Sequence, residues 1–316
     1  MKCPLAFRIV RSGTLAAALA ALFATPAAQA AAITWVNGTS VGQNAWGAKN
    51  NWTPATAVPT AADDVTFNST TANTVTLANT PTAVGSITQA GTGAGTLSKT
   101  GADTLTLSGT NTYTGAITVS AGTLIATTSA DALGTGAATL ALSGGSLQLA
   151  NNTGLAFNRN TTVSANTTIT SDLLANGAGV TQTLGTLSIG AQTLSVAKGS
   201  HVTSGTAGLT FGATTLSGAA TFNPASGTNL TLGALSGTST GLTKQGAGQL
   251  TLSAAGTFTG GVTLNAGVLQ LGNAGALNAT AGSENAVAFG VGSTGTLQLN
   301  GNSAVIANLT SNATPG

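Results

Sequence analysis

Charged residues are scarce in this chain of 316 residues. Eight residues are basic and six are acidic, so that charged residues make up 4% of the sequence, against about 25% in ordinary globular domains. A single histidine, His201, is present. Acid-base catalysis needs several titratable groups held close together, and here they are widely spread. The sequence therefore predicts no catalytic, metal or cofactor-binding site.

The adjacent acids Asp63 and Asp64 are the one exception to this dispersal. They precede Val65-Thr-Phe67, and neighbouring side chains of an extended segment point to opposite faces. We interpret them as turn and cap residues, with a calcium-binding or catalytic pair as the alternative. His201 follows Gly199-Ser200, which predicts a solvated turn residue.

Cysteine is almost absent, because Cys3 is the only one and it lies in a predicted leader. The leader has the pattern of a cleaved signal peptide over residues 1–30. Its features are the basic residues Lys2, Arg8 and Arg11, an apolar run over 15–23 and the sequence Ala28-Gln29-Ala30. The run is shorter than the roughly 20 residues of a membrane span. We expect export, no stable membrane insertion and no disulfides.

Removal of the leader changes the charge balance, since three of the eight basic residues lie in it. The rest of the chain keeps five basic and six acidic residues, and the basic ones are far apart. Nucleic-acid binding needs clustered lysine and arginine. The sequence therefore predicts no nucleic-acid partner.

Short apolar-polar-apolar triplets fill the remainder of the chain and indicate β-strands. Gly-containing turns separate them at intervals of about 8–12 residues. Examples are Leu105-Thr-Leu107, Ile117-Thr-Val119, Leu140-Ala-Leu142, Leu147-Gln-Leu149, Leu250-Thr-Leu252 and Leu297-Gln-Leu299. This spacing alone allows a sandwich, a barrel or a β-helix. We expect Leu107 and Leu252 to point into the core.

A long internal repeat decides among these architectures. Residues 97–124 and 242–269 are near-copies at a constant offset of 145 residues. Self-similarity of this kind is typical of solenoids, in which each unit buries its apolar face against its neighbours. We predict coils of about 20–25 residues that place equivalent positions above one another at intervals of about 4.8 Å. We therefore predict a β-helix over residues 83–316.

A second pattern, apolar-Gly-x-apolar, brackets the copies. It occurs as Val84-Gly-Ser-Ile87, Leu184-Gly-Thr-Leu187 and Leu232-Gly-Ala-Leu235, with the variant Ile306-Ala-Asn-Leu309. The tetrads at 84 and 232 precede the two copies. The variant at 306 then indicates that another unit opens close to the last residue, and we expect the β-helix to be truncated there.

All three tryptophans, Trp35, Trp46 and Trp52, fall in the segment 31–82. An open stack of coils needs a cover for its first apolar layer, and bulky aromatic side chains suit that role. We predict an N-terminal cap. The alternative is an aromatic platform in which these tryptophans contact a carbohydrate.

The two copies resemble the autotransporter-associated β-strand repeat, also called the passenger-associated transport repeat. The first copy matches its pattern at Leu97, Lys99, Gly101, Leu105, Leu107, Gly109, Tyr113, Gly115, Gly122 and Leu124. The second matches at Leu242, Lys244, Gly246, Gly248, Leu250, Leu252, Phe258, Gly260, Gly261, Gly267 and Leu269. Asp103 and Ala254 replace glycines of the pattern. The resemblance implies a right-handed parallel β-helix exported to or past the outer membrane of a Gram-negative-type bacterium.

Autotransporters end in a translocator barrel, and this sequence ends in Ala313-Thr-Pro-Gly316 without one. We expect the chain at the cell surface or outside the cell, and in the periplasm if no translocator is supplied. Lys99 and Lys244 recur at one position of the repeat, and we predict exposed charges that oppose sideways aggregation.

Two functions remain open. The first is a non-catalytic surface or secreted scaffold, a stalk or adhesin that meets a surface polysaccharide or a host or matrix ligand, with self-association by stacking. The second is a module that binds or cleaves polysaccharide.

Overall fold

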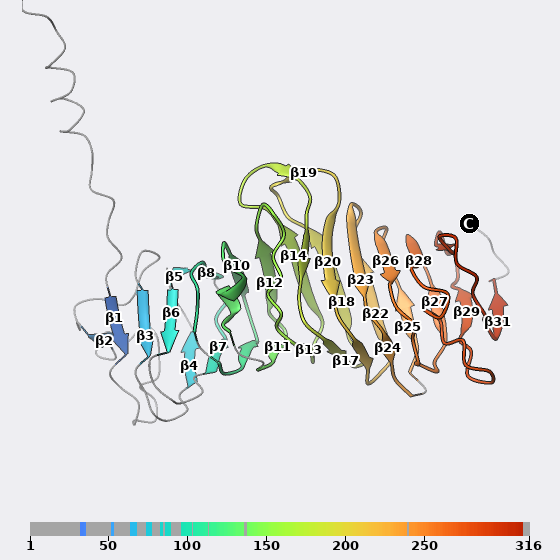
Figure 1. The fold of residues 1–316 in the computed structure, drawn as a ribbon, viewed down its shortest axis with the longest axis horizontal. Coiled ribbons are helices and arrows are strands. Elements are labelled where there is room, and N and C mark those ends of the chain that lie inside the picture. The colour runs from blue at the N-terminus through green and yellow to red at the C-terminus, as the bar shows by residue number, and fades with distance from the viewer. Residues whose placement is uncertain are drawn as a thin grey trace, which may run out of the picture.

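A computed structural model describes residues 96–311 except 103, 113, 136, 137 and 239, together with the backbone of six short strands within 32–89. The predicted signal peptide lies outside the described residues. The described chain is a parallel β-solenoid that winds through three sheets (Figure 1). It contains no α-helix, only the 3-10 turn η2 (Ala130–Leu133).

The first face is an eight-stranded sheet. Its strands are β4 (Thr74–Leu77), β7 (Thr96–Lys99), β9 (Ile117–Val119), β11 (Leu140–Leu142), β13 (Thr161–Val163), β17 (Leu187–Ile189), β21 (Thr214–Leu216) and β24 (Leu235–Ser236).

The second face is an eleven-stranded sheet that runs the length of the stack, so it records about ten turns of the chain. Its strands are β5 (Ala83–Val84), β8 (Thr104–Leu107), β10 (Thr123–Thr127), β12 (Ser146–Ala150), β14 (Thr167–Asp172), β18 (Thr193–Lys198), β22 (Ala220–Pro224), β25 (Leu242–Lys244), β27 (Val262–Leu264), β29 (Ala286–Phe289) and β31 (Asn308–Thr310).

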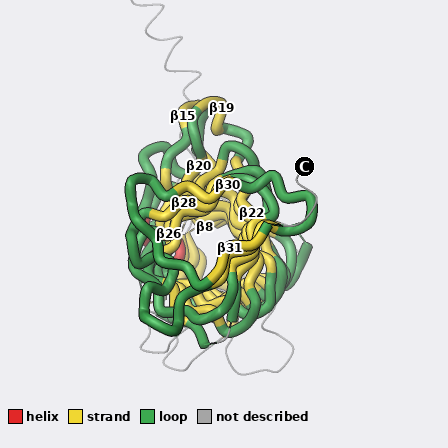
Figure 2. The backbone as a smooth tube through the Cα atoms, turned by 90° about the vertical axis from the view of Figure 1, so that its right-hand side faces the viewer, coloured by secondary structure: helices red, strands yellow, loops and turns green. Residues whose placement is uncertain are grey.

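The third face is a six-stranded sheet confined to the C-terminal half. Its strands are β16 (Thr181–Thr183), β20 (Ala207–Phe211), β23 (Thr228–Leu232), β26 (Gln249–Leu252), β28 (Val268–Leu271) and β30 (Thr296–Gln298). Figure 2 looks along the solenoid and shows the strands arranged around a common interior.

Two small sheets complete the fold. β15 (Gly177–Ala178) and β19 (Val202–Ser204) pair in a lobe that stands out from the stack in both views (Figures 1 and 2). The lobe comprises residues 173–180 of one coil and 199–206 of the next. At the N-terminal end β1 (Ala32–Trp35), β3 (Asp64–Phe67) and β6 (Ser86–Gln89) pair in parallel, and β2 (Trp52–Thr53) pairs antiparallel with β1. The capping role of segment 31–82 stays a prediction.

Coil length varies because the turns between strands absorb the insertions. On the second face Leu105 pairs with Leu124, 19 residues later, whereas Leu194 pairs with Phe222, 28 residues later. On the second face the longest coils are those that carry the lobe. Parallel register is kept throughout, so the strands stay in phase while the loops differ.

The interior is a stack of apolar side chains supplied by alternate strand residues. Leu105, Leu124 and Leu147 are successive register partners, and each is at most 1% exposed. Leu107 and Leu252 are fully buried, which confirms the inward orientation predicted for them. Burial of each leucine contributes about 1.5–3 kcal/mol relative to exposure, so the stack supplies most of the driving force.

Two of the apolar-Gly-x-apolar tetrads, those at 184 and 232, mark one corner of the solenoid, whereas the tetrad at 84 joins β5 of the second face to β6 and the variant at 306 leads into β31 of the second face. Leu184 follows β16 and Leu187 opens β17, while Leu232 ends β23 and Leu235 opens β24. Both tetrads thus carry the chain from the third face to the first. Their two apolar residues are buried on either side of the corner.

The two repeat copies do not lie above one another, contrary to the simple stacking expected from the sequence. In the first copy β7 belongs to the first face and β8 to the second. In the second copy the corresponding strands, β25 and β26, belong to the second and third faces. An offset of 145 residues therefore equals six coils and one further face, and the copy is rotated by one side of the solenoid.

Replacement of Leu107 by Asp tests the register. We expect Leu107→Asp to lower the free energy of unfolding by about 4 kcal/mol or more, because it buries an uncompensated charge. Thr106 precedes it on the same strand and points outward, so Thr106→Asp should change stability by less than about 1 kcal/mol. Denaturant unfolding monitored by circular dichroism measures both. Equal midpoints for the two variants would show that the register is wrong.

Candidate functional site

The two repeated lysines are buried, so the prediction of exposed, aggregation-opposing charges is wrong. Lys99 is 2% exposed and Lys244 is 0% exposed. The physical reason lies in the strand alternation. Each lysine stands two residues after an inward leucine, Leu97 or Leu242, and therefore points inward as well.

The Lys244 ammonium lies inside a cradle of backbone carbonyl oxygens. Its Nζ donates to the oxygens of Gln245 at 2.6 Å and Gly246 at 2.7 Å, in the turn that follows its own strand. It also donates to the oxygen of Ala266 at 2.9 Å, in the next coil. One side chain therefore closes a turn and joins two consecutive coils.

Lys99 makes the corresponding contacts in the first copy. Its Nζ donates to the oxygen of Gly101 in the following turn and reaches the oxygen of Ala121 at 3.5 Å in the next coil. Gly101 and Ala121 are the counterparts of Gly246 and Ala266 at the offset of 145 residues. The same cradle thus forms on two different edges of the solenoid, one per copy.

Gly267 explains why the repeat has glycine beside the cradle. Its φ is 67°, a left-handed conformation that favours glycine. A Cβ atom there would lie 2.4 Å from the oxygens of Gly246 and Gly248 and 2.8 Å from Lys244 Nζ. A larger residue would therefore displace the carbonyls that hold the ammonium.

Burial sets the protonation behaviour of Lys244. Removal of the ammonium from water lowers the pKa of Lys244 from 10.5 to about 8. The three carbonyl dipoles favour the charged form and offset part of this desolvation. At neutral pH the side chain is therefore charged and donates its three hydrogen bonds.

A second buried charge lies at the base of the lobe. Asp172 is 2% exposed, and its Oδ1 accepts the backbone N–H of Leu173 at 2.8 Å and of His201 at 3.0 Å. Its Oδ2 accepts from Gln148 Nε2 at 2.9 Å and lies 3.2 Å from His201 Nδ1. Asp172 thus ties three coils together beneath the lobe.

His201 is a turn residue, as predicted, but its ring is held by a carboxylate. Its side chain is 44% exposed, which leaves Nε2 on the solvent side of the Asp172 contact. The two residues are 29 positions apart in sequence, close to one coil. In many enzymes a carboxylate orients a histidine whose imidazole acts as the general base, and Asp172 and His201 have the geometry of such a pair. Among the residues that the structure describes, no three histidine, cysteine or acidic side chains gather into a metal-ligand group.

Gly199 is required by this arrangement. A Cβ atom at Gly199 would lie 2.0 Å from the Asp172 Cγ, because the chain of the next coil passes directly over the carboxylate. The Gly-Ser-His turn predicted from the sequence therefore packs directly against the buried Asp172 carboxylate.

The predicted tryptophan platform lies in the least described part of the chain. The structure pairs Trp35 of β1 with Trp52 of β2 in register, and Trp46 lies outside the described residues. Asp64 opens β3, whereas Asp63 and Asp103 lie outside the described residues. The carbohydrate contact at these tryptophans and the role of the Asp63-Asp64 pair both stay predictions.

Comparison with known proteins identifies the repeat. The family model described as Passenger-associated-transport-repeat matches residues 97–126 and 242–271, which confirms the resemblance seen in the sequence. Each match covers one lysine cradle and the strands around it. Neither the search of curated proteins nor the search of solved structures found a match. In the described residues no helix is long and apolar enough to span a membrane.

Lys244→Met tests the cradle, because methionine keeps the length of the side chain and removes the charge. We expect it to lower the free energy of unfolding by about 2–4 kcal/mol, since three carbonyls lose a charged donor. The exposed Lys198 is the matched control, and Lys198→Met should change stability by less than about 0.5 kcal/mol. Similar losses in both variants would contradict the cradle.

The pH dependence of stability gives a second test. Between pH 8 and pH 10.5 the unfolded chain keeps the Lys244 proton that the folded chain has lost, so folding becomes more favourable as the pH rises. We expect the parent protein to gain stability relative to Lys244→Met across this window. Chemical unfolding at several pH values measures the difference. A difference that is constant or falls between pH 8 and pH 10.5 would contradict the lowered pKa.

Asp172→Ala should loosen the lobe without unfolding the stack. The change leaves the buried N–H groups of Leu173 and His201 without their acceptor, a local cost of about 2–3 kcal/mol. Amide hydrogen exchange over residues 173–180 and 199–206 should accelerate. Glu284 is a partly exposed acid outside the lobe that also accepts a backbone N–H, that of Gly282 at 2.9 Å, and Glu284→Ala should leave exchange in the lobe unchanged. Unaltered exchange in Asp172→Ala would show that the carboxylate does not hold the lobe.

Proposed function

We propose that this chain is a non-catalytic scaffold of the autotransporter-passenger type, a rigid stalk that displays its outer faces at the surface of a bacterium or in its surroundings. The observation that carries the proposal is the pair of passenger-associated transport repeats within one solenoid. Both repeats use their recurring lysine to close the backbone inside the stack, which is a structural role. A stalk needs such internal joints and needs no reactive groups.

The outer surface supports the same proposal. Outward strand positions are mainly threonine, serine, asparagine and glutamine, which present neutral hydrogen-bonding groups. Surfaces of this kind suit adhesion through many weak contacts. A stalk or adhesin would meet its polysaccharide, host or matrix partner through them.

The competing function is polysaccharide cleavage, and the Asp172–His201 pair is the observation that favours it. Acid-base cleavage of a glycosidic bond uses two carboxyl groups that flank the bond. Asp172 is buried and already accepts four hydrogen bonds. The pair is therefore better suited to hold the lobe than to transfer protons.

Localisation and turnover together test the proposal. Antibody detection on intact cells of the producing bacterium, before and after external protease, should place the chain at the cell surface or in the medium. The purified chain should release no reducing sugar from polysaccharides. Retention in the cytoplasm would overturn the scaffold proposal. So would turnover that is lost in His201→Ala.

A further inference from the structure

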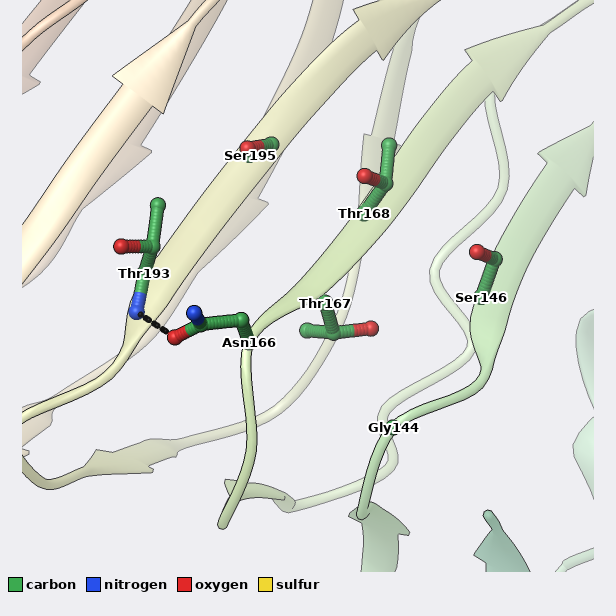
Figure 3. A pocket seen from close by; sticks show the side chains of 7 residues that line it. All are labelled: Gly144, Ser146, Asn166, Thr167, Thr168, Thr193 and Ser195. Carbon is green, nitrogen blue, oxygen red and sulfur yellow. Dashed lines mark hydrogen bonds between the residues drawn. The ribbon is translucent and has the colours of Figure 1, made fainter. Parts of the chain in front are cut away.

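A groove of about 440 Å³ opens on the outer side of the second face (Figure 3). It lies where β12, β14 and β18 begin, next to the corner with the first face. The residues that line it are Gly144, Ser146, Asn166, Thr167, Thr168, Thr193 and Ser195. None of these side chains carries a charge, and none is aromatic.

Several polar groups in this groove have no partner among the residues that the structure describes. Ser146, Thr168 and Ser195 are register neighbours on consecutive coils, whose strands lie about 4.8 Å apart along the stack. The hydroxyls of Ser146 and Thr168 make no hydrogen bond to another described group. The Ser195 hydroxyl accepts from Asn223 Nδ2 at 3.2 Å and keeps its own proton to donate.

The groove floor adds an amide and another hydroxyl. Asn166 Oδ1 accepts the backbone N–H of Thr193 at 2.8 Å, which fixes the side chain and leaves its NH₂ group toward the groove (Figure 3). The Thr193 hydroxyl makes no hydrogen bond to a described group. The Thr167 hydroxyl, in contrast, is used within the protein, because it donates to the oxygen of Gly145 at 2.5 Å.

Part of the third face differs from the groove, because several of its outward side chains are linked to one another. There Gln249 Nε2 donates to Gln270 Oε1 at 2.7 Å, and Gln270 Nε2 reaches Gln298 Oε1 at 3.4 Å. Thr251 donates to Asn229 Oδ1 at 3.1 Å in the same ladder. In this part of the third face outward side chains are linked to one another, whereas in the groove the hydroxyls of Ser146, Thr168 and Thr193 have no partner among the described residues.

We propose that the groove binds a neutral glycan chain that lies across the strands, along the axis of the stack. This inference rests on the proposed function, because it assigns a class of ligand to the outer surface that the proposed stalk displays. Sugar hydroxyls both donate and accept, and so do the serine and threonine hydroxyls that face them. A glycan that crosses three coils meets a repeated row of such groups.

The other ligand classes fit the groove less well. A polyanion would find no cation among the lining residues, because Lys198 lies at the opposite end of β18. An apolar ligand would leave the hydroxyls and the amide buried without partners. An extended peptide would need an open strand edge, and β14 is paired on both sides, with β12 and β18.

Affinity gel electrophoresis of the full chain tests this proposal, with dextran, laminarin and xyloglucan as neutral glycans and alginate as the polyanion. At least one neutral glycan should retard the parent chain, and alginate should not. Thr168→Val and Ser146→Ala should each weaken retardation about three- to tenfold, the effect of one net hydrogen bond.

Thr162→Val is the matched control. Thr162 lies in the same coil, points outward from β13 on the first face and loses the same hydroxyl without touching the groove. It should bind like the parent. The proposal is overturned if no neutral glycan retards the chain, if alginate alone does, or if Thr162→Val weakens binding as much as Thr168→Val. A chain that is surface-exposed but not retarded would overturn this inference and leave the scaffold proposal intact.

Discussion

The stability of this solenoid depends on finding hydrogen-bond donors for the buried carbonyl groups at its corners. Along the strands each coil pairs with the next, but pairing stops where the chain turns, and buried carbonyls without donors are costly. The buried polar side chains meet this need. Asn285 Nδ2 donates to the oxygens of Phe258 and Gly260, Asn111 to that of Ala132, and Arg159 to that of Gly115. The Lys244 cradle is the charged form of the same solution, with three acceptors instead of one or two.

This internal use of polar groups connects the composition to the proposed role. Of the four basic side chains in the described residues, Lys99, Lys244 and Arg159 lie inside the stack and are at most 2% exposed. The described exterior carries few charges, so its properties depend largely on which hydroxyls and amides pair with each other. On the third face five outward side chains form a hydrogen-bonded ladder, whereas in the groove of the second face three hydroxyls have no partner among the described residues.

The strands, the parallel stacking and the inward leucines could be predicted because period-two alternation and an internal repeat report directly on a coil. The lysine burial could also have been read from the sequence, since Lys244 is in phase with Leu242. It was missed because a charge is ordinarily placed outside. The Asp172–His201 contact joins residues one coil apart, and the coil length there depends on the lobe insertion. The unpaired hydroxyls of the groove could not be predicted, because no sequence pattern tells which outward hydroxyls form hydrogen bonds with each other.

The rotation of the second copy by one face has a consequence for how such a chain can grow. Because the repeat closes its own corner, it does not need to sit above an earlier copy to be accommodated. A duplicated gene segment therefore need not encode a whole number of coils, and recombination at many lengths yields a continuous stack. The same independence would let a protein engineer graft the lysine corner onto any edge of a three-sided solenoid.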